Sequence, residues 1–397
     1  MNRKEYMEEL RLALAKVDKD LRDEILEDYE EHFENGTKYG KTEQQICIEL
    51  GDIKELIKEL GQFEQEITKQ PQRNIEQKEE AVISNQSQSL PVRQIIVKAL
   101  FADVNITRSH NTKIEVNCHH DGDRKQQMIY RFNSWQDGEC IYAEVVQENS
   151  STGFFNFLKT PQMRIDITVP ENFPVLDVNS ASGNIDVTGL KVENTKLITS
   201  SGDIQINGVT GNHLVSKSQS GDVELQNCSI NIIEVQSKSG DVDIRSIKSE
   251  TLIGHSISGD VNINDINFQQ IEINSTSGDL DGSNLIGNKL SANSKSGDIN
   301  MNSTVKECVT KTISGDITWN AYGDINLFAD SISGDIDISL NNHGNGYEAT
   351  VQSVSGEEHL FFSNESHNFY KSGKYIFGNA GSKLAVKTTS GNIEIRG

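Results

Sequence analysis

The sequence is poor in basic residues and has no long apolar run, and each shortage excludes a class of protein. Lysine and arginine number 37 against 59 aspartates and glutamates, so the 397 residues carry a net charge of −22. Nucleic acids and anionic membrane surfaces are bound through lysine and arginine, so neither partner is expected. No stretch approaches the roughly 18 consecutive apolar residues that a membrane-spanning helix requires.

Aromatic residues and cysteines are also scarce. Aromatic residues make up 6% of the chain, whereas Gly, Ser, Asn and Asp are abundant, which favours many short strands joined by turns. The five cysteines are an odd number and include no Cys-x-x-Cys pair, a pattern typical of thiols in a reducing compartment. The amino-terminal segment is charged throughout and lacks the apolar core of a secretory signal, so we expect a soluble, cytoplasmic protein.

A small all-α domain is predicted over residues 1–67. Apolar residues recur at three- and four-residue spacing over residues 7–17 and 21–33, which places them on one face of each of two helices. Thr42 and Gln45 form a capping box that predicts the start of a third helix.

The second predicted helix is strongly acidic, with seven Asp and Glu residues between positions 23 and 34. Such a run of charge fits a solvated helix face and also fits a docking surface for a basic partner, and both interpretations stay open. The candidate partner-binding residues are Glu24, Glu27, Asp28, Tyr29, Glu31 and Phe33.

The character of the sequence changes after the helical domain. Residues 68–91 are rich in Gln, Ser and charge and show no hydrophobic period, which predicts a flexible linker. From residue 92 apolar residues alternate with polar ones, the period of β-strands. Because residues 92–178 contain no regular repeat, we expect an irregular β section that caps the repeats that follow.

A Ser-Gly-Asp motif repeats at a fixed period through the rest of the chain. Its glycines stand at positions 183, 202, 221, 240, 259, 278 and 297, and the series continues at Gly315, Gly334 and Gly356. The interval is 19 up to Gly297 and then 18, 19 and 22. Self-similarity of this kind predicts a solenoid. Left-handed solenoids are built on hexapeptides, and 19 is not a multiple of six, so we predict a mainly β fold: a right-handed parallel β-helix over residues 179–397.

Apolar residues occupy the same positions in successive repeats, and these positions are predicted to face inward. They form short half-buried strands separated by turns, which implies a three-sided coil whose strands pair with those of the next coil. The last inward position is predicted to hold Leu214, Ile233, Leu252, Ile271, Leu290, Val309 and Leu327.

The Ser-Gly-Asp turn allows a structural and a ligand-binding interpretation. In the structural one, Gly supplies a positive φ and Asp accepts a backbone N–H within the turn. A row of aspartates could instead bind Ca²⁺, but each coil supplies one carboxylate and Ca²⁺ takes about six to eight oxygens. We therefore favour the structural role. The predicted turn residues are Gly202, Asp203, Gly221, Asp222, Gly240, Asp241, Gly259, Asp260, Gly278, Asp279, Gly297, Asp298, Gly315, Asp316, Gly334 and Asp335.

No motif predicts a catalytic, cofactor or metal site. The run Cys-His-His-Asp at residues 118–121 lacks a second pair at ligand spacing, and we interpret it as part of a hairpin. A β-helical polysaccharide lyase or hydrolase would need a cleft built from long loops and aromatic residues to bind sugars. The coils here are nearly constant in length, so we expect a protein that is not an enzyme and needs no cofactor.

The helical domain resembles the HAAS-type signalling domain of bacteria. The resemblance rests on EILEDYEEHFENG at residues 24–36, Gly-Lys-Thr at residues 40–42 and Glu-Leu-Gly-Asp at residues 49–52. That family accompanies PadR-like transcription regulators, which implies a protein partner of that class. Its motif positions fall on Asp28, Tyr29, His32 and Phe33.

The β part is similar to an adhesin family of β-strand repeat proteins. The similarity rests on Ile-Asp-Ile-Thr-Val-Pro at residues 165–170, followed by serial Ser-Gly-Asp-Ile turns. Some relatives are associated with cell-envelope stress operons, so the resemblance implies a link to that response. The architecture is also similar to that of the bactofilins, cytoskeletal solenoids that polymerise end to end.

Three functions follow as hypotheses. The first is a cytoplasmic scaffold or signalling protein that engages a partner through its helical domain. The second is a self-assembling structural solenoid, because residues 390–397 begin a coil whose first strand is expected to lie uncovered and available for pairing. The third is a surface adhesin.

Overall fold

The structure of the protein is a computed structural model. It describes residues 2–16, 22, 26, 29–30, 33–34, 36–38, 41–50, 53, 91–109, 113–122, 129–147, 161–362, 365–369 and 372–397. The helices belong to one of the two compact units into which the chain divides and the solenoid coils to the other, so each is described by itself. The predicted linker, residues 68–91, lies outside the described residues except for Pro91.

The helical part begins with α1 (Arg3–Ala13), which continues into a 3₁₀ turn (Leu14–Lys16), and it includes α3 (Glu43–Leu50). Asn2 caps α1: its side-chain oxygen accepts a hydrogen bond from the Glu5 N–H (2.9 Å), and the Glu5 carboxylate accepts one from the Asn2 N–H (3.0 Å). The capping box predicted before α3 is confirmed, because Thr42 and Gln45 exchange the corresponding bonds at 2.9 and 3.3 Å.

The helical core is small and partly aromatic. The inward face predicted for the first helix is confirmed for Met7, Leu10 and Leu14, which are buried. Tyr6 stacks on Tyr29, with ring centroids 6.0 Å apart. The core comprises Tyr6, Met7, Leu10, Leu14, Leu26, Tyr29, Phe33, Ile46, Cys47, Leu50 and Ile53.

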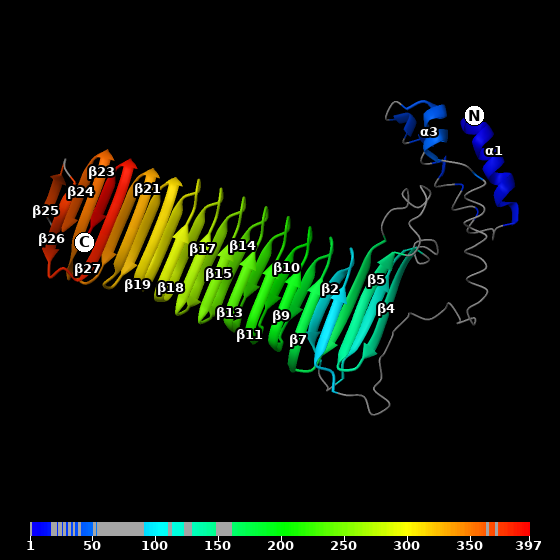
Figure 1. The fold of residues 1–397 in the computed structure, drawn as a ribbon, viewed down its shortest axis with the longest axis horizontal. Coiled ribbons are helices and arrows are strands. Elements are labelled where there is room, and N and C mark those ends of the chain that lie inside the picture. Colours follow the sequence, from blue (N-terminus) through cyan, green and yellow to red (C-terminus); the bar gives the residue numbers. More distant parts are fainter. Residues whose placement is uncertain are drawn as a thin grey trace. The chain divides into compact units, whose positions relative to one another are not determined.

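The remaining described residues form a stack of β-strands (Figure 1). The amino-terminal section contains β1 (Gln94–Lys98), β2 (Asp103–Arg108), β3 (Glu115–His120), β4 (Tyr130–Asp137), β5 (Cys140–Gln147) and β6 (Met163–Val169). The first coils contain β7 (Asn172–Asn179), β8 (Ile185–Thr188), β9 (Lys191–Ile198), β10 (Ile204–Asn207), β11 (Thr210–Lys217), β12 (Val223–Gln226), β13 (Ser229–Gln236), β14 (Val242–Lys248) and β15 (Thr251–His255).

The later coils contain β16 (Val261–Asn267), β17 (Gln270–Asn274), β18 (Leu280–Asn293), β19 (Ile299–Ser314), β20 (Ile317–Tyr322), β21 (Asn326–Ser333) and β22 (Ile336–Asn341). The carboxyl-terminal section contains β23 (Gly346–Ser355), β24 (Glu358–Phe362), β25 (Glu365–Phe369), β26 (Gly373–Gly378), β27 (Ser382–Ser390) and β28 (Ile393–Arg396).

Each strand of the repeat pairs in parallel with its equivalents in the coils before and after it. Ile204, for example, pairs with Ile185 on one side and with Val223 on the other, and both stand at its own position in their repeats. The predicted parallel β-solenoid with 19-residue coils is therefore confirmed, and Figure 1 shows its strands side by side along the green-to-orange part of the chain.

Burial divides each coil into three inward-facing runs. In the coil that starts at Val242, buried residues alternate with outward ones along 242–244, 247–249 and 252–256. Two consecutive outward residues interrupt the alternation at 245–246 and at 250–251, and the third corner is the Ser-Gly-Asp turn.

The corner after the first run needs a left-handed backbone. One residue with φ between +52° and +69° stands at the same position of six successive coils: Gly189, Gly208, Asn227, Ser246, Asp265 and Asn284. Gly, Asn and Asp adopt this conformation at low cost, which explains five of the six identities.

The next coil lacks that left-handed residue, because it is one residue shorter. The pairing of β18 with β19 shifts from Gly282 opposite Met301 to Leu285 opposite Ser303, which removes one residue. Cys308, 2% exposed, consequently takes the inward position, and Val309 is 40% exposed. The predicted inward orientation of Val309 is therefore wrong.

The pairing order departs from the chain order at both ends of the stack. At the start, β1 lies between β5 and β7, and β2 pairs with β6 and β8. At the other end, β27 lies between β21 and β23, and β28 between β22 and β24. Ile393 of β28 thus pairs with Ile336 and Glu358, so the prediction of an uncovered final strand is wrong.

Candidate functional surfaces

The Ser-Gly-Asp corner is a column of repeated hydrogen bonds in which a second serine, two residues before the motif serine, joins two coils. Ser218 is buried, and its hydroxyl accepts the Gly221 N–H (2.9 Å) and donates to the Gly202 carbonyl of the preceding coil (3.1 Å). The same pair of bonds forms around Ser237 and Ser294. The serine therefore closes its own turn and also holds the neighbouring coil.

The glycine of the motif is required by close packing between coils. A Cβ on Gly221 would overlap the carbonyl oxygen of Gly202, and the same overlap recurs at each motif glycine from Gly183 to Gly334. None of these glycines has a positive φ. The predicted reason for glycine is therefore wrong, although its structural position in the turn is as described.

The aspartate of the motif also bonds between coils. The Oδ1 atom of Asp203 accepts the backbone N–H of Asp222 in the following coil at 2.9 Å, where a bond within the turn was predicted. The chain of such bonds runs from Asp103 through Asn184 to Asp335, and Asn392 continues it to Glu357. Charge-assisted bonds of this kind offset the repulsion between stacked carboxylates.

The face next to this corner is acidic. Burial raises the pKa of Asp186, and the nearby Asp103 and Asp203 carboxylates raise it further. Burial, followed by the Glu394 carboxylate, likewise raises the pKa of Asp337. From residue 161 onward the chain has 16 basic and 29 acidic residues, so the coils as a whole repel anionic partners.

No metal centre is visible in the described part of the chain, where no three His, Cys, Asp or Glu residues are grouped to hold an ion. In the 118–121 run, His120 Nδ1 accepts the Gly122 N–H at 2.9 Å, which fits the turn expected there. The absence of a metal or cofactor stays a prediction.

The predicted partner-binding residues fall into two groups. Glu24, Glu27, Asp28 and Glu31 lie outside the described residues, as does His32. Tyr29 and Phe33 are 3% and 0% exposed and belong to the helical core. Their assignment to a contact surface is corrected accordingly, because their rings pack against Tyr6.

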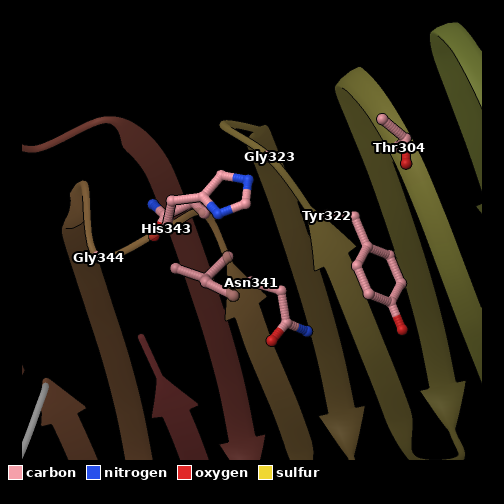
Figure 2. Close-up of a pocket in the computed structure, with 8 residues that line it drawn as sticks. Thr304, Tyr322, Gly323, Asn341, His343 and Gly344 are labelled. Carbon is pink, nitrogen blue, oxygen red and sulfur yellow. The ribbon is translucent and has the colours of Figure 1, made fainter.

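One hollow of about 670 Å³ lies on the solenoid where the coil length changes (Figure 2). The nearly constant coil length predicted that no loops would form a cleft. The signal was present in the glycine spacing, because the shorter interval before Gly315 and the longer one before Gly356 flank this region. The lining residues are Thr304, Tyr322, Gly323, Leu340, Asn341, Asn342, His343 and Gly344.

The architecture defines a two-part repeat protein, a helical domain followed by a parallel β-solenoid. Residues 92–252 and 226–396 match the Toastrack DUF4097 family model, and the chain belongs to that family. Residues 5–59 match the HAAS family, so the resemblance found in the sequence is confirmed for both parts.

Two solved structures are similar to the chain. One, from Bacteroides fragilis, is described as a putative adhesin and is 14% identical in sequence. The match covers 78% of this chain and 94% of that chain, with a TM-score of 0.29. The other, from Clostridium sporogenes, is described as a putative cell adhesion protein, with 10% identity, 77% and 93% covered, and a TM-score of 0.17. Both TM-scores are below 0.5, so neither likeness bears on the function. No curated protein matches the chain significantly.

Among the helices that the structure describes, none has the length and apolar character needed to cross a membrane.

Proposed function

We propose that this chain is a non-enzymatic scaffold in a signalling pathway. The observation that supports this proposal is the union of a HAAS domain with a solenoid whose repeated corner residues bond coil to coil. HAAS domains mediate protein–protein interaction, and neither matched family is catalytic. The solenoid then serves as a rigid body that carries the helical domain.

The partner we propose is a basic protein surface, with a PadR-like transcription regulator as the first candidate. The acidic residues Glu24, Glu27, Asp28 and Glu31 would form the contact, while Tyr29 and Phe33 hold the helix in its fold from inside the core. A cytoplasmic location and a role in the envelope-stress response are parts of the same proposal.

Binding of the purified full chain to a PadR-like regulator from the same cells tests the proposal. We expect binding that weakens with added salt, because surface charges are screened. It should also be lost in the variant E24Q/E27Q/D28N/E31Q. The matched control neutralises four exposed acids of the solenoid: Glu171, Glu193, Glu250 and Glu307. Equal binding by both variants, or none by the natural chain, would count against the acidic surface.

The self-assembling alternative loses the observation on which it rested, since β28 is paired on both sides. The adhesin alternative has no support beyond the descriptions of the two similar structures.

A further inference from the structure

The hollow on the solenoid exists because neighbouring coils differ in length there. β19 is continuous over Ile299–Ser314, without the left-handed corner residue of the earlier coils. In the following two coils the left-handed residues lie further along the chain than that corner: Gly323 (φ +89°) in one, and His343 and Gly344 (φ +57° and +72°) in the next. A short coil next to longer loops leaves a depression, which those loops border (Figure 2).

The loop at the edge of the hollow is held by a polar network. Asn342 is 4% exposed, and its Nδ2 donates to the Gly346 carbonyl (2.7 Å) and to Asp324 Oδ1 (3.3 Å). The other oxygen of Asp324 accepts a bond from Asn345 (2.8 Å). Such bonds fix the loop before any ligand arrives, which lowers the entropic cost of binding.

The same network leaves one acceptor unused. Within the described residues, the Oδ1 atom of Asn342 is buried and has no hydrogen-bond partner. A buried polar oxygen without a partner costs free energy, so a ligand hydroxyl or a water molecule that reached it would be favoured.

The lining of the hollow combines one exposed ring with neutral polar groups. Tyr322 is 52% exposed, and Figure 2 shows its ring between Thr304 on one side and Asn341 and His343 on the other. The lining includes no Lys, Arg, Asp or Glu. A ligand suited to it is uncharged, carries several hydroxyl groups and has an apolar face to lie on the ring.

We propose that this hollow binds a neutral saccharide, with a pyranose ring on Tyr322 and its hydroxyls on Thr304, Asn341 and His343. The volume of about 670 Å³ lies within the range of small-molecule sites, about 300–1,000 Å³. The site is independent of the helical domain and of the partner proposed for it.

Titration calorimetry and saturation-transfer NMR on the full chain test this site. The probes are maltotetraose, cellotetraose and the tetramer of N-acetylglucosamine. We expect at least one of them to bind with a Kd of about 1 mM or tighter. Tyr322→Ala should weaken that binding about tenfold or more, whereas Tyr322→Phe keeps the ring and should retain most of the affinity.

Phe328→Ala is the matched control, because Phe328 is a partly exposed ring on β21 that does not line the hollow. Its affinity should equal that of the natural chain, and an unchanged unfolding midpoint for each variant would exclude a loss of fold. The proposal is overturned if none of the three probes binds, or if Tyr322→Ala and Phe328→Ala affect binding equally.

Discussion

Three residues of the Ser-Gly-Asp corner have different structural roles: the buried serine two residues before the motif serine, and the glycine and aspartate of the motif. Serine closes the turn and holds the preceding coil, glycine allows the two backbones to approach, and aspartate accepts an N–H from the coil that follows. All three therefore act between coils. These roles explain why Thr stands for Ser at residues 199, 312 and 388, and Asn for Asp at residues 184 and 392, while glycine has no substitute.

Gly221→Ala tests the close approach of the coils. The added Cβ would overlap the Gly202 carbonyl oxygen, and relief requires a backbone shift because that oxygen is not on a flexible side chain. We expect a loss of about 1–3 kcal/mol in the free energy of unfolding, measured by urea denaturation. Ser220→Ala, at the exposed neighbouring position, should change it by less than about 0.5 kcal/mol. A tolerated Gly221→Ala would show that the coils can separate there.

Glu358 is a second residue whose environment determines a measurable property. It is 2% exposed and stands at the start of β24, opposite Ile393, at a position that is apolar in the coils of the body. Its Oε1 accepts the Ser353 N–H at 3.1 Å, whereas its Oε2 is buried without a partner among the described residues. Burial raises the pKa of this carboxyl, and bonds from Ser353 and Ser372 only partly oppose the rise.

The sign of the pH effect follows from the raised pKa. The folded state favours the protonated acid, so this contribution to stability is fully present below the unfolded pKa and is lost as pH rises through the folded pKa. Thermal unfolding followed from acidic to neutral pH should therefore show a decline that Glu358→Gln makes smaller, while the raised pKa values of Asp186 and Asp337 maintain the remainder. Glu357→Gln, at the exposed neighbour, should leave the decline in place. The same slope in Glu358→Gln and the natural chain would contradict this assignment.

At the scale of the elements, one missing residue shifts the register of a strand. β19 lacks the left-handed corner residue, so every later inward position in that coil moves by one, and Cys308 replaces Val309. The fixed period predicted most inward positions because the side chains of a strand alternate strictly. The fixed period failed at Val309 because the spacing of the motif glycines shows that a coil lacks one residue, but it does not show where in the coil that residue is missing.

The reactivity of the cysteines tests this register. Burial raises the pKa of the Cys308 and Cys228 thiols, so both should resist a thiol reagent in the native protein. Cys118, on β3, and Cys140, on β5, are partly exposed and should react before them. Mass spectrometry after timed labelling reports each site. Rapid labelling of Cys308 in the folded chain would favour the register with Val309 inward.

At the scale of the whole molecule, the repeat was predictable and the order of its ends was not. The fixed spacing appears in the local sequence, and one glycine per coil is enough to reveal it. The insertion of β28 between β22 and β24 joins Ile393 to Glu358, although β25, β26 and β27 separate them along the chain. No local pattern contains that information, since parallel pairing places no demand on the connection between strands beyond its length. The hollow beside Tyr322 was missed for a related reason. Its location follows only when the short interval before Gly315 is considered together with the long interval before Gly356.

The covered carboxyl-terminal strand also bears on association between molecules. A solenoid polymerises end to end through unpaired strand edges, and here β28 is closed on both sides, while β23 and β24 pair onward with the antiparallel strands β26 and β25. A net charge of −22 adds repulsion between copies. We therefore expect light scattering to give a constant monomer mass across a concentration series, equally with calcium and with EDTA, because each ladder carboxylate already accepts a backbone N–H. A mass that rose with concentration would restore the self-assembling solenoid, and a rise only with calcium would assign the aspartate column to cation binding.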